Sequence, residues 1–155
     1  MKSFTNYNYK LRLDLTVALR YADIYKLSEG ICNHFSVELP ENPNCFLINP
    51  QGLHWSEIHP SELVLVNKNN YATEGKYNVE KTALYIHKFM HTLIGKKCVF
   101  HTHMPNATAL TLLRDSKLMI DANQGAMRFY NRIQYYNKYN GLIINEKSAS
   151  QLIKN

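Results

Sequence analysis

The chain has 155 residues, of which 45% are hydrophobic and 19% are charged, and its formal net charge is +6. This length fits one domain with a single core, and the composition excludes a disordered chain. No stretch approaches the roughly 18 consecutive apolar residues of a membrane-spanning helix. The polar residues 1–11 lack the apolar centre of a signal peptide, so we expect a cytoplasmic protein with no membrane partner.

The positive charge is spread along the whole chain. Eighteen lysines and arginines exceed twelve acidic residues, but only Lys96 and Lys97 are adjacent. A protein that binds nucleic acid usually gathers such residues in a patch or a stripe. The scattered charge favours an ordinary solvated surface, and we expect no nucleic-acid partner.

Three cysteines, Cys32, Cys45 and Cys98, are widely spaced and form no CxxC motif. An odd number of cysteines at such spacing does not make a disulfide framework. Thiols stay reduced in the cytosol. We therefore expect each cysteine to be a small buried apolar residue rather than a nucleophile.

The first half of the chain alternates between elements and turns. Apolar residues recur at helical spacing over 11–27, and Gly30 follows as a stop signal. Alternation over 34–39 predicts a strand, and the apolar runs 45–48 and 63–66 predict two more. Segments rich in Asn, Pro and Gly separate these strands, which indicates an antiparallel sheet with tight turns.

The second half adds further helices and strands. The pattern predicts helices over 79–93, 106–113 and 146–154, a buried strand over 97–101, and two weaker strands over 133–136 and 142–144. Helices of this kind bury an apolar side against a sheet. The sequence therefore predicts an α/β sandwich in which helices pack on a mainly antiparallel sheet.

His101 and His103 stand where the strand over 97–101 ends. Residues two apart in a strand face the same way, with Cα atoms about 6.6–6.8 Å apart, so both imidazoles can converge on one metal ion. Histidine nitrogen is a good ligand for Zn²⁺. The alternative is a pair of polar residues bonded to backbone or water.

A catalytic zinc site usually has three protein ligands. No histidine follows His103, so a third ligand would come from an earlier histidine or from a carboxylate. The carboxylate candidates are Glu74, Glu80 and Asp115.

His87 and His91 lie four residues apart, on one side of the helix predicted over 79–93. Lys88 follows His87, so the HExxH motif of zinc proteases is absent. We interpret the two residues as histidines on a helix surface or at an interface.

Four segments resemble a known family in the family's own order. Segment 30–37 reads GICNHFSV, 46–53 reads FLINPQGL, 58–64 reads IHPSELV and 99–109 reads VFHTHMPNATA. They are similar to the first conserved loop, the phosphate-side loop, the stretch after it, and the metal strand with its helix in class II aldolases and adducins. The segments 129–133 and 139–141 resemble the adducin-like bacterial branch of that family.

The resemblance implies a three-layer α/β/α sandwich and one domain over residues 1–155. It implies that His101 and His103 bind Zn²⁺, which polarises the carbonyl of a small phosphorylated sugar. It also implies a homo-oligomer. In the phosphate-side region, Asn33, Ser36, Gln51 and Gly52 are the candidate residues for binding the substrate anion.

The sequence departs from the family pattern at three points. The family's third histidine ligand lies far beyond the first two and has no counterpart before Asn155, so we expect a domain that lacks the C-terminal strand and helices. The loop 49–52 lacks the usual Thr and Ser hydroxyls. The position of the catalytic glutamate falls on Ala83, which leaves Glu80 as the candidate base. Otherwise Glu80 is a first-turn glutamate that stabilises the start of its helix.

Three functions remain open at this point. The first is a Zn²⁺-dependent carbon–carbon lyase of the class II aldolase type. The second is an interaction protein like the adducin head, with a cytoskeletal partner and a contact surface that includes Tyr130, Tyr135, Tyr136 and Tyr139. The third is an inactive remnant of such a domain.

Overall fold

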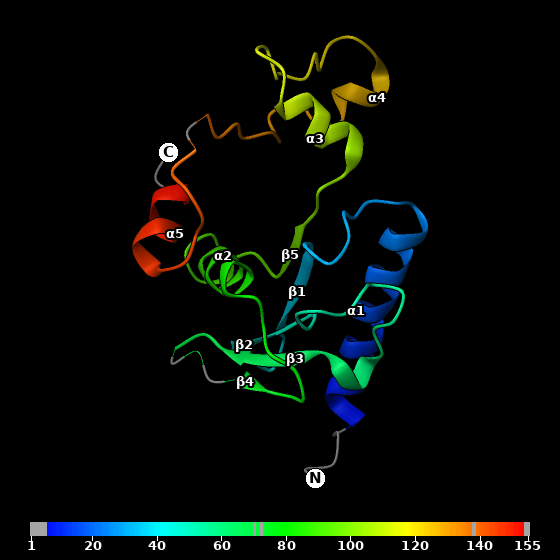
Figure 1. Cartoon of the computed structure of the whole chain (residues 1–155), viewed down its shortest axis with the longest axis vertical. Coiled ribbons are helices and arrows are strands. Elements are labelled where there is room, and N and C mark those ends of the chain that lie inside the picture. The colour runs from blue at the N-terminus through cyan, green and yellow to red at the C-terminus, as the bar shows by residue number, and fades with distance from the viewer. Residues whose placement is uncertain (1–5, 70, 72, 138, 154–155) are drawn as a thin grey trace.

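The computed structural model describes residues 6–69, 71, 73–137 and 139–153. It contains a five-stranded antiparallel sheet with helices on both faces (Figure 1). The strands are β1 (His34–Leu39), β2 (Asn42–Ile48), β3 (Val64–Asn67), β4 (Thr73–Glu74) and β5 (Cys98–His101), in the order β4-β3-β2-β1-β5. The predicted α/β/α sandwich with an antiparallel sheet is confirmed.

Helix α1 (Asn6–Ile24) covers one face of the sheet. Its residues Leu15, Leu19 and Ala22 recur at helical spacing and are buried against Phe35 and Leu47 of the sheet. Burying a large apolar side chain stabilises a fold by about 1.5–3 kcal/mol. This apolar contact therefore fixes the position of β1 and β2 relative to α1.

Helix α2 (Lys81–Thr92) covers the opposite face, where Ala83 packs on Phe46, Ile48, Val64 and Val66. Side chains of a strand alternate between the two faces. In β2, for example, Leu47 belongs to the α1 core, whereas its neighbours Phe46 and Ile48 belong to the α2 core.

The same alternation governs β1. Phe35 and Leu39 join the core under α1, so His34, Ser36 and Glu38 face α2. All three of these polar side chains are buried. The sequence of β1 thus puts polar groups inside the molecule, where each needs a hydrogen-bonding partner.

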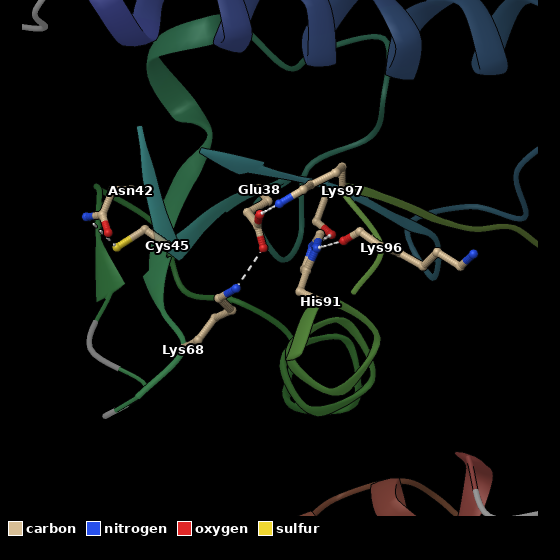
Figure 2. A network of polar contacts seen from close by, with 8 residues as sticks. Glu38, Asn42, Cys45, Lys68, His91, Lys96 and Lys97 are labelled. Atoms are coloured by element: carbon tan, nitrogen blue, oxygen red, sulfur yellow. Dashed lines mark hydrogen bonds and ion pairs between the residues drawn. The ribbon is translucent and has the colours of Figure 1, made fainter. Parts of the chain in front are cut away.

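Glu38 finds its partners in two lysines (Figure 2). Lys68 Nζ donates to its carboxylate over 2.7 Å, and Lys97 Nζ donates to the other oxygen. Burial alone would raise the pKa of Glu38, but the two lysines outweigh burial and lower it. The carboxylate is therefore ionised within the fold.

The chain after β5 forms α3 (Pro105–Thr111), α4 (Gln124–Met127) and α5 (Glu146–Ile153). In Figure 1, α3 and α4 lie beyond the end of β5, and α5 lies beside α2. Lys88 of α2 and Glu146 of α5 form an ion pair of 2.7 Å. Within the described residues, no helix is long and apolar enough to cross a membrane.

Some elements differ from those predicted. The segments 133–136 and 142–144 are not strands, because no strand among the described residues pairs with them. The short elements β4, α4 and the 3-10 helix Pro60–Glu62 carry no clear sequence pattern and were not predicted.

The prediction that all three cysteines are buried is wrong for two of them. Cys45 is buried in the core under α1, but Cys32 and Cys98 are exposed. Cys32 lies in the loop before β1, and Cys98 lies in β5 at the edge of the described sheet. All three thiols are free, as expected.

Candidate functional site

A pocket of about 610 Å³ opens where β1 and β5 lie side by side, next to the start of α2 and the loop after β2. Antiparallel pairing puts His34 of β1 directly opposite His101 of β5. Six of the seven predicted site residues line this pocket: Asn33, Gln51, Gly52, Glu80, His101 and His103. Residues from four separate segments of the sequence therefore meet at one place.

The two predicted metal ligands point toward each other. His101 Nε2 lies 3.0 Å from His103 Nε2, and the two rings are nearly perpendicular, at 68°. Burial lowers the pKa of His101, and the neighbouring His103 lowers it further. A neutral imidazole is the form that binds a metal ion. This donor pair therefore fits two ligands of a zinc site.

A third ligand is not in place. Among the described residues, no group of three His, Cys, Asp or Glu side chains is arranged to hold a metal ion. Glu29 comes near, with its carboxylate 3.2 Å from His103 Nδ1, but it contacts the nitrogen that faces away from His101. A carboxylate in that place orients the imidazole instead of binding the metal directly.

Asn33 fixes the backbone of His103. Its Oδ1 accepts a hydrogen bond of 2.6 Å from His103 N–H, and its Nδ2 donates to Glu29 O over 3.0 Å. Asn49 supports this corner in turn, because its Nδ2 donates to Asn33 O and its Oδ1 accepts from Phe35 N–H. The sequence analysis did not predict a role for Asn49. The available signal was its position as a polar residue directly after the strand that ends at Ile48.

The predicted phosphate-side loop also lines the pocket. Gln51 and Gly52 are exposed, and Gln51 N–H donates to Asn78 O over 2.8 Å. Gly52 has a φ of +85°, a conformation that glycine adopts without strain. The loop therefore owes its shape to Gly52 and its attachment to Asn78.

Glu80 is the N-cap of α2. Its carboxylate accepts hydrogen bonds from Ala83 N–H, over 2.8 Å, and from the Thr82 hydroxyl. Burial acts to raise the pKa of Glu80, but these hydrogen bonds lower it overall. The side chain lines the pocket as an ionised carboxylate whose position is set by the helix that it caps.

Ser36 and two histidines of α2 lie behind the pocket. Ser36 is fully buried, and it contacts His87 and His91 instead of lining the pocket. Of the two interpretations of His87 and His91, a helix surface or an interface, the helix surface is wrong, because both side chains are buried and contact Ser36 of the sheet. The alternation of β1, which points Ser36 toward α2, was the signal that sequence reasoning missed.

His34 connects this buried cluster to the pocket. Its ring lines the pocket and stacks on His101, with centroids 4.3 Å apart, and its Nδ1 lies 2.6 Å from His87 Nε2. Burial lowers the pKa of His34 to about 3. Sequence reasoning gave His34 no specific role, although it lies two residues before Ser36 in the same strand.

The fold is shared with solved structures of the aldolase II superfamily and of a sugar-phosphate aldolase. The family model described as Class II Aldolase and Adducin N-terminal domain matches residues 14–154. The chain therefore belongs to the class II aldolase and adducin family, as its sequence motifs predicted.

Three similar proteins illustrate this family. Alpha-adducin of Rattus norvegicus is 28% identical over 149 residues, which cover 94% of this chain and 20% of that protein. The crystal structure of an aldolase II superfamily protein from Pseudomonas syringae is 26% identical, with a TM-score of 0.85, and the match covers 97% of this chain and 60% of that one. L-fuculose 1-phosphate aldolase from Glaciozyma antarctica has the same fold, with 22% identity, a TM-score of 0.78, and coverage of 98% and 61%. The chain thus spans less than two thirds of the length of each of these proteins.

Proposed function

We propose that this chain carries out metal-dependent lyase chemistry of the class II aldolase type on a small phosphorylated sugar. The observation that carries the proposal is the convergence of His101 Nε2 and His103 Nε2, 3.0 Å apart, inside a pocket lined by polar groups. Family membership supports it, since the family includes sugar-phosphate aldolases. Two imidazoles supply part of the ligand set, and a third ligand comes from outside the described residues or from another copy of the chain.

In this proposal, His101 and His103 hold Zn²⁺, which when bound acts as a Lewis acid on a substrate carbonyl. Asn33 keeps His103 in place through the backbone hydrogen bond of 2.6 Å. Gln51 and Gly52 line the same pocket, where polar groups of the loop meet the anionic end of the substrate. Glu80 is the carboxylate available in the pocket as a proton acceptor.

Metal content tests this proposal directly. The chain is purified without chelators, and zinc is measured by elemental analysis in the wild type, in His103→Ala and in a control, His59→Ala, which changes an exposed histidine outside the pocket. We expect about one zinc ion per chain in the wild type and the control, and loss in His103→Ala. Equal trace amounts in all three proteins would contradict the proposal.

Exposed tyrosines after α4 favour a second candidate function, an interaction surface like that of the adducin relatives. The exposed fractions of Tyr130, Tyr136 and Tyr139 are 57%, 39% and 87%, whereas Tyr135 OH accepts a hydrogen bond from Leu118 N–H. Tyrosine is enriched at protein interfaces. Sedimentation of the wild type and of a variant with these three tyrosines changed to Ser tests this function. A monomer in both samples argues against self-association.

A cytoplasmic, homo-oligomeric state belongs to the lyase proposal. The third hypothesis, an inactive remnant, is its alternative. A chain that binds no metal and associates with nothing supports that third hypothesis. A cooperative thermal transition of the chain alone would weaken it, because it would show that the described core folds by itself.

A further inference from the structure

Four buried side chains form a continuous row of hydrogen bonds that ends at the pocket. Starting far from the pocket, His91 Nδ1 lies 2.5 Å from the Lys96 carbonyl oxygen (Figure 2). His91 Nε2 lies 2.7 Å from Ser36 Oγ, which also contacts His87 Nδ1. His87 Nε2 then lies 2.6 Å from His34 Nδ1. We call these four side chains the histidine relay.

The carbonyl at the far end sets the direction of every hydrogen bond in the relay. A carbonyl oxygen only accepts, so His91 carries its proton on Nδ1 and a neutral His91 accepts from Ser36 at Nε2. The Ser36 hydroxyl has then used its proton, and it accepts from His87 Nδ1–H. A neutral His87 accepts at Nε2, so the donor at the last contact is His34 Nδ1–H.

His87 and His91, the two histidines behind the pocket, are neutral because they are sealed from water. His87 is 0% exposed and His91 is 3% exposed, and no carboxylate among the described residues forms a hydrogen bond with either ring. Burial lowers the pKa of His87 well below its usual value and also lowers that of His91. Each imidazole thus has one ring N–H, and only one assignment of donors and acceptors fits all the hydrogen bonds of the relay.

We infer that the histidine relay holds His34 with its proton on Nδ1, so that its Nε2 offers a fixed hydrogen-bond acceptor for a hydroxyl group of the ligand. The His34 ring lines the pocket and stacks on His101, and no hydrogen bond reaches its Nε2 within the described part of the chain. An acceptor beside the predicted metal ligands favours a polyhydroxylated ligand and disfavours an anionic group at that point. The inference deepens the proposed function, on which its ligand class rests.

His34 in this inference touches the ligand, whereas His87, Ser36 and His91 are positioning residues that act through it. A solvent-exposed histidine exchanges between its two neutral tautomers and would present either a donor or an acceptor. The relay removes that freedom. If the His34 proton moved to Nε2, the lone pairs of His34 Nδ1 and His87 Nε2 would face each other at the contact of 2.6 Å. Specificity for a hydroxyl then depends on His87, Ser36 and His91, which do not line the pocket and act through His34.

Nitrogen-15 spectra of the histidine rings test the relay without metal or substrate. The whole chain is labelled on histidine, and long-range proton–nitrogen correlations are recorded near pH 7.5. We expect Nδ1–H tautomers for His34, His87 and His91. An Nε2–H tautomer at His34, or averaging between both forms, would overturn the inference.

Two substitutions of Ser36 test whether the hydrogen bonds of the relay, and not packing, set the tautomer of His34. Ser36→Thr keeps a hydroxyl, and we expect it to keep the tautomer of His34. Ser36→Ala removes the hydroxyl between His87 and His91, and we expect the His34 spectrum to move toward the tautomer average. An unchanged His34 tautomer in Ser36→Ala would show that the relay does not set it. The wild-type spectrum decides the question if Ser36→Ala does not fold.

Ligand preference is then measured with glycerol 1-phosphate and propyl phosphate, which share a phosphate and a three-carbon chain and differ in hydroxyl groups. We expect wild-type protein to bind glycerol 1-phosphate about tenfold more tightly, a difference of about 1.4 kcal/mol that one hydrogen bond can supply, and we expect the His34 Nε2 signal to shift on binding. The preference should disappear in His34→Phe. Equal binding of both probes, or binding of neither, would overturn the hydroxyl recognition. Loss of zinc alone would count only against the proposed function.

Discussion

Lys68 Nζ lies 2.7 Å from the carboxylate of Glu38, and both side chains are buried, with 10% and 4% of their surfaces exposed. Lys97 reaches the same carboxylate from the protein surface, where 74% of its side chain is exposed. The carboxylate of Glu38 in β1 thus pairs with one buried and one exposed lysine. Because the pair is buried and Lys97 is not, the two lysines differ in what they contribute to stability.

We expect Glu38→Gln to lower the free energy of unfolding by about 3 kcal/mol, because it leaves the buried Lys68 ammonium without its partner charge. Lys97→Gln is the matched control and should cost less than about 1 kcal/mol, since the charge that it removes is on an exposed side chain and Glu38 keeps Lys68 as its partner. Urea unfolding at pH 7 measures both. Equal losses for the two variants would contradict this ranking.

The buried histidines predict a loss of stability in mild acid. Burial lowers the pKa of His87 and His91, so below about pH 6.5 the unfolded chain binds protons that the folded chain does not. Stability is then complete above that pH and falls as pH decreases toward the folded pKa, by about 1.4 kcal/mol per pH unit for each such histidine. Urea unfolding at pH 8, 6 and 5 measures this slope.

The control for this slope is His91→Gln, which has no titratable ring at that position. It should unfold with a shallower pH dependence than the wild type, by up to one proton. A slope identical to that of the wild type would show that His91 binds a proton equally well in both states.

Glu80 offers a way to separate a helix cap from a catalytic base. Glu80→Ala removes the acceptor for Ala83 N–H and should lower the unfolding free energy by about 1 kcal/mol. Glu80→Asn should keep most of that stability, because Asn also caps helices, but it removes the carboxylate. Thermal unfolding of both variants measures the cap. An activity lost equally in both variants would mark the carboxylate as part of the chemistry.

Substitutions of Asn33 test how much its two side-chain hydrogen bonds stabilise the fold around His103. Asn33→Ala leaves His103 N–H and Glu29 O without their side-chain partners, and we expect a loss of about 2 kcal/mol in unfolding free energy. Asn33→Asp keeps an acceptor for His103 N–H and should lose less. If the alanine variant is as stable as the wild type, Asn33 does not hold this corner.

Much of the fold could be predicted because its signals are local. The spacing of Leu15 and Leu19 predicted α1, the alternation over 34–39 predicted β1, and the HxH motif predicted that His101 and His103 converge. Periodicity of two and 3.6 residues follows from backbone geometry alone. The strands predicted over 133–136 and 142–144 were wrong because a strand needs a partner that local sequence does not specify.

The sequence by itself determined the family, the antiparallel sandwich and most of the candidate pocket residues. Only the tertiary structure decided that Ser36, His87 and His91 lie inside, and that they connect to His34 at the pocket wall. The reason is physical: β1 and α2 are separated by more than forty residues, and the pairing of their polar faces depends on how the helix packs on the sheet. The direction of hydrogen bonds in a buried network depends on all its members together.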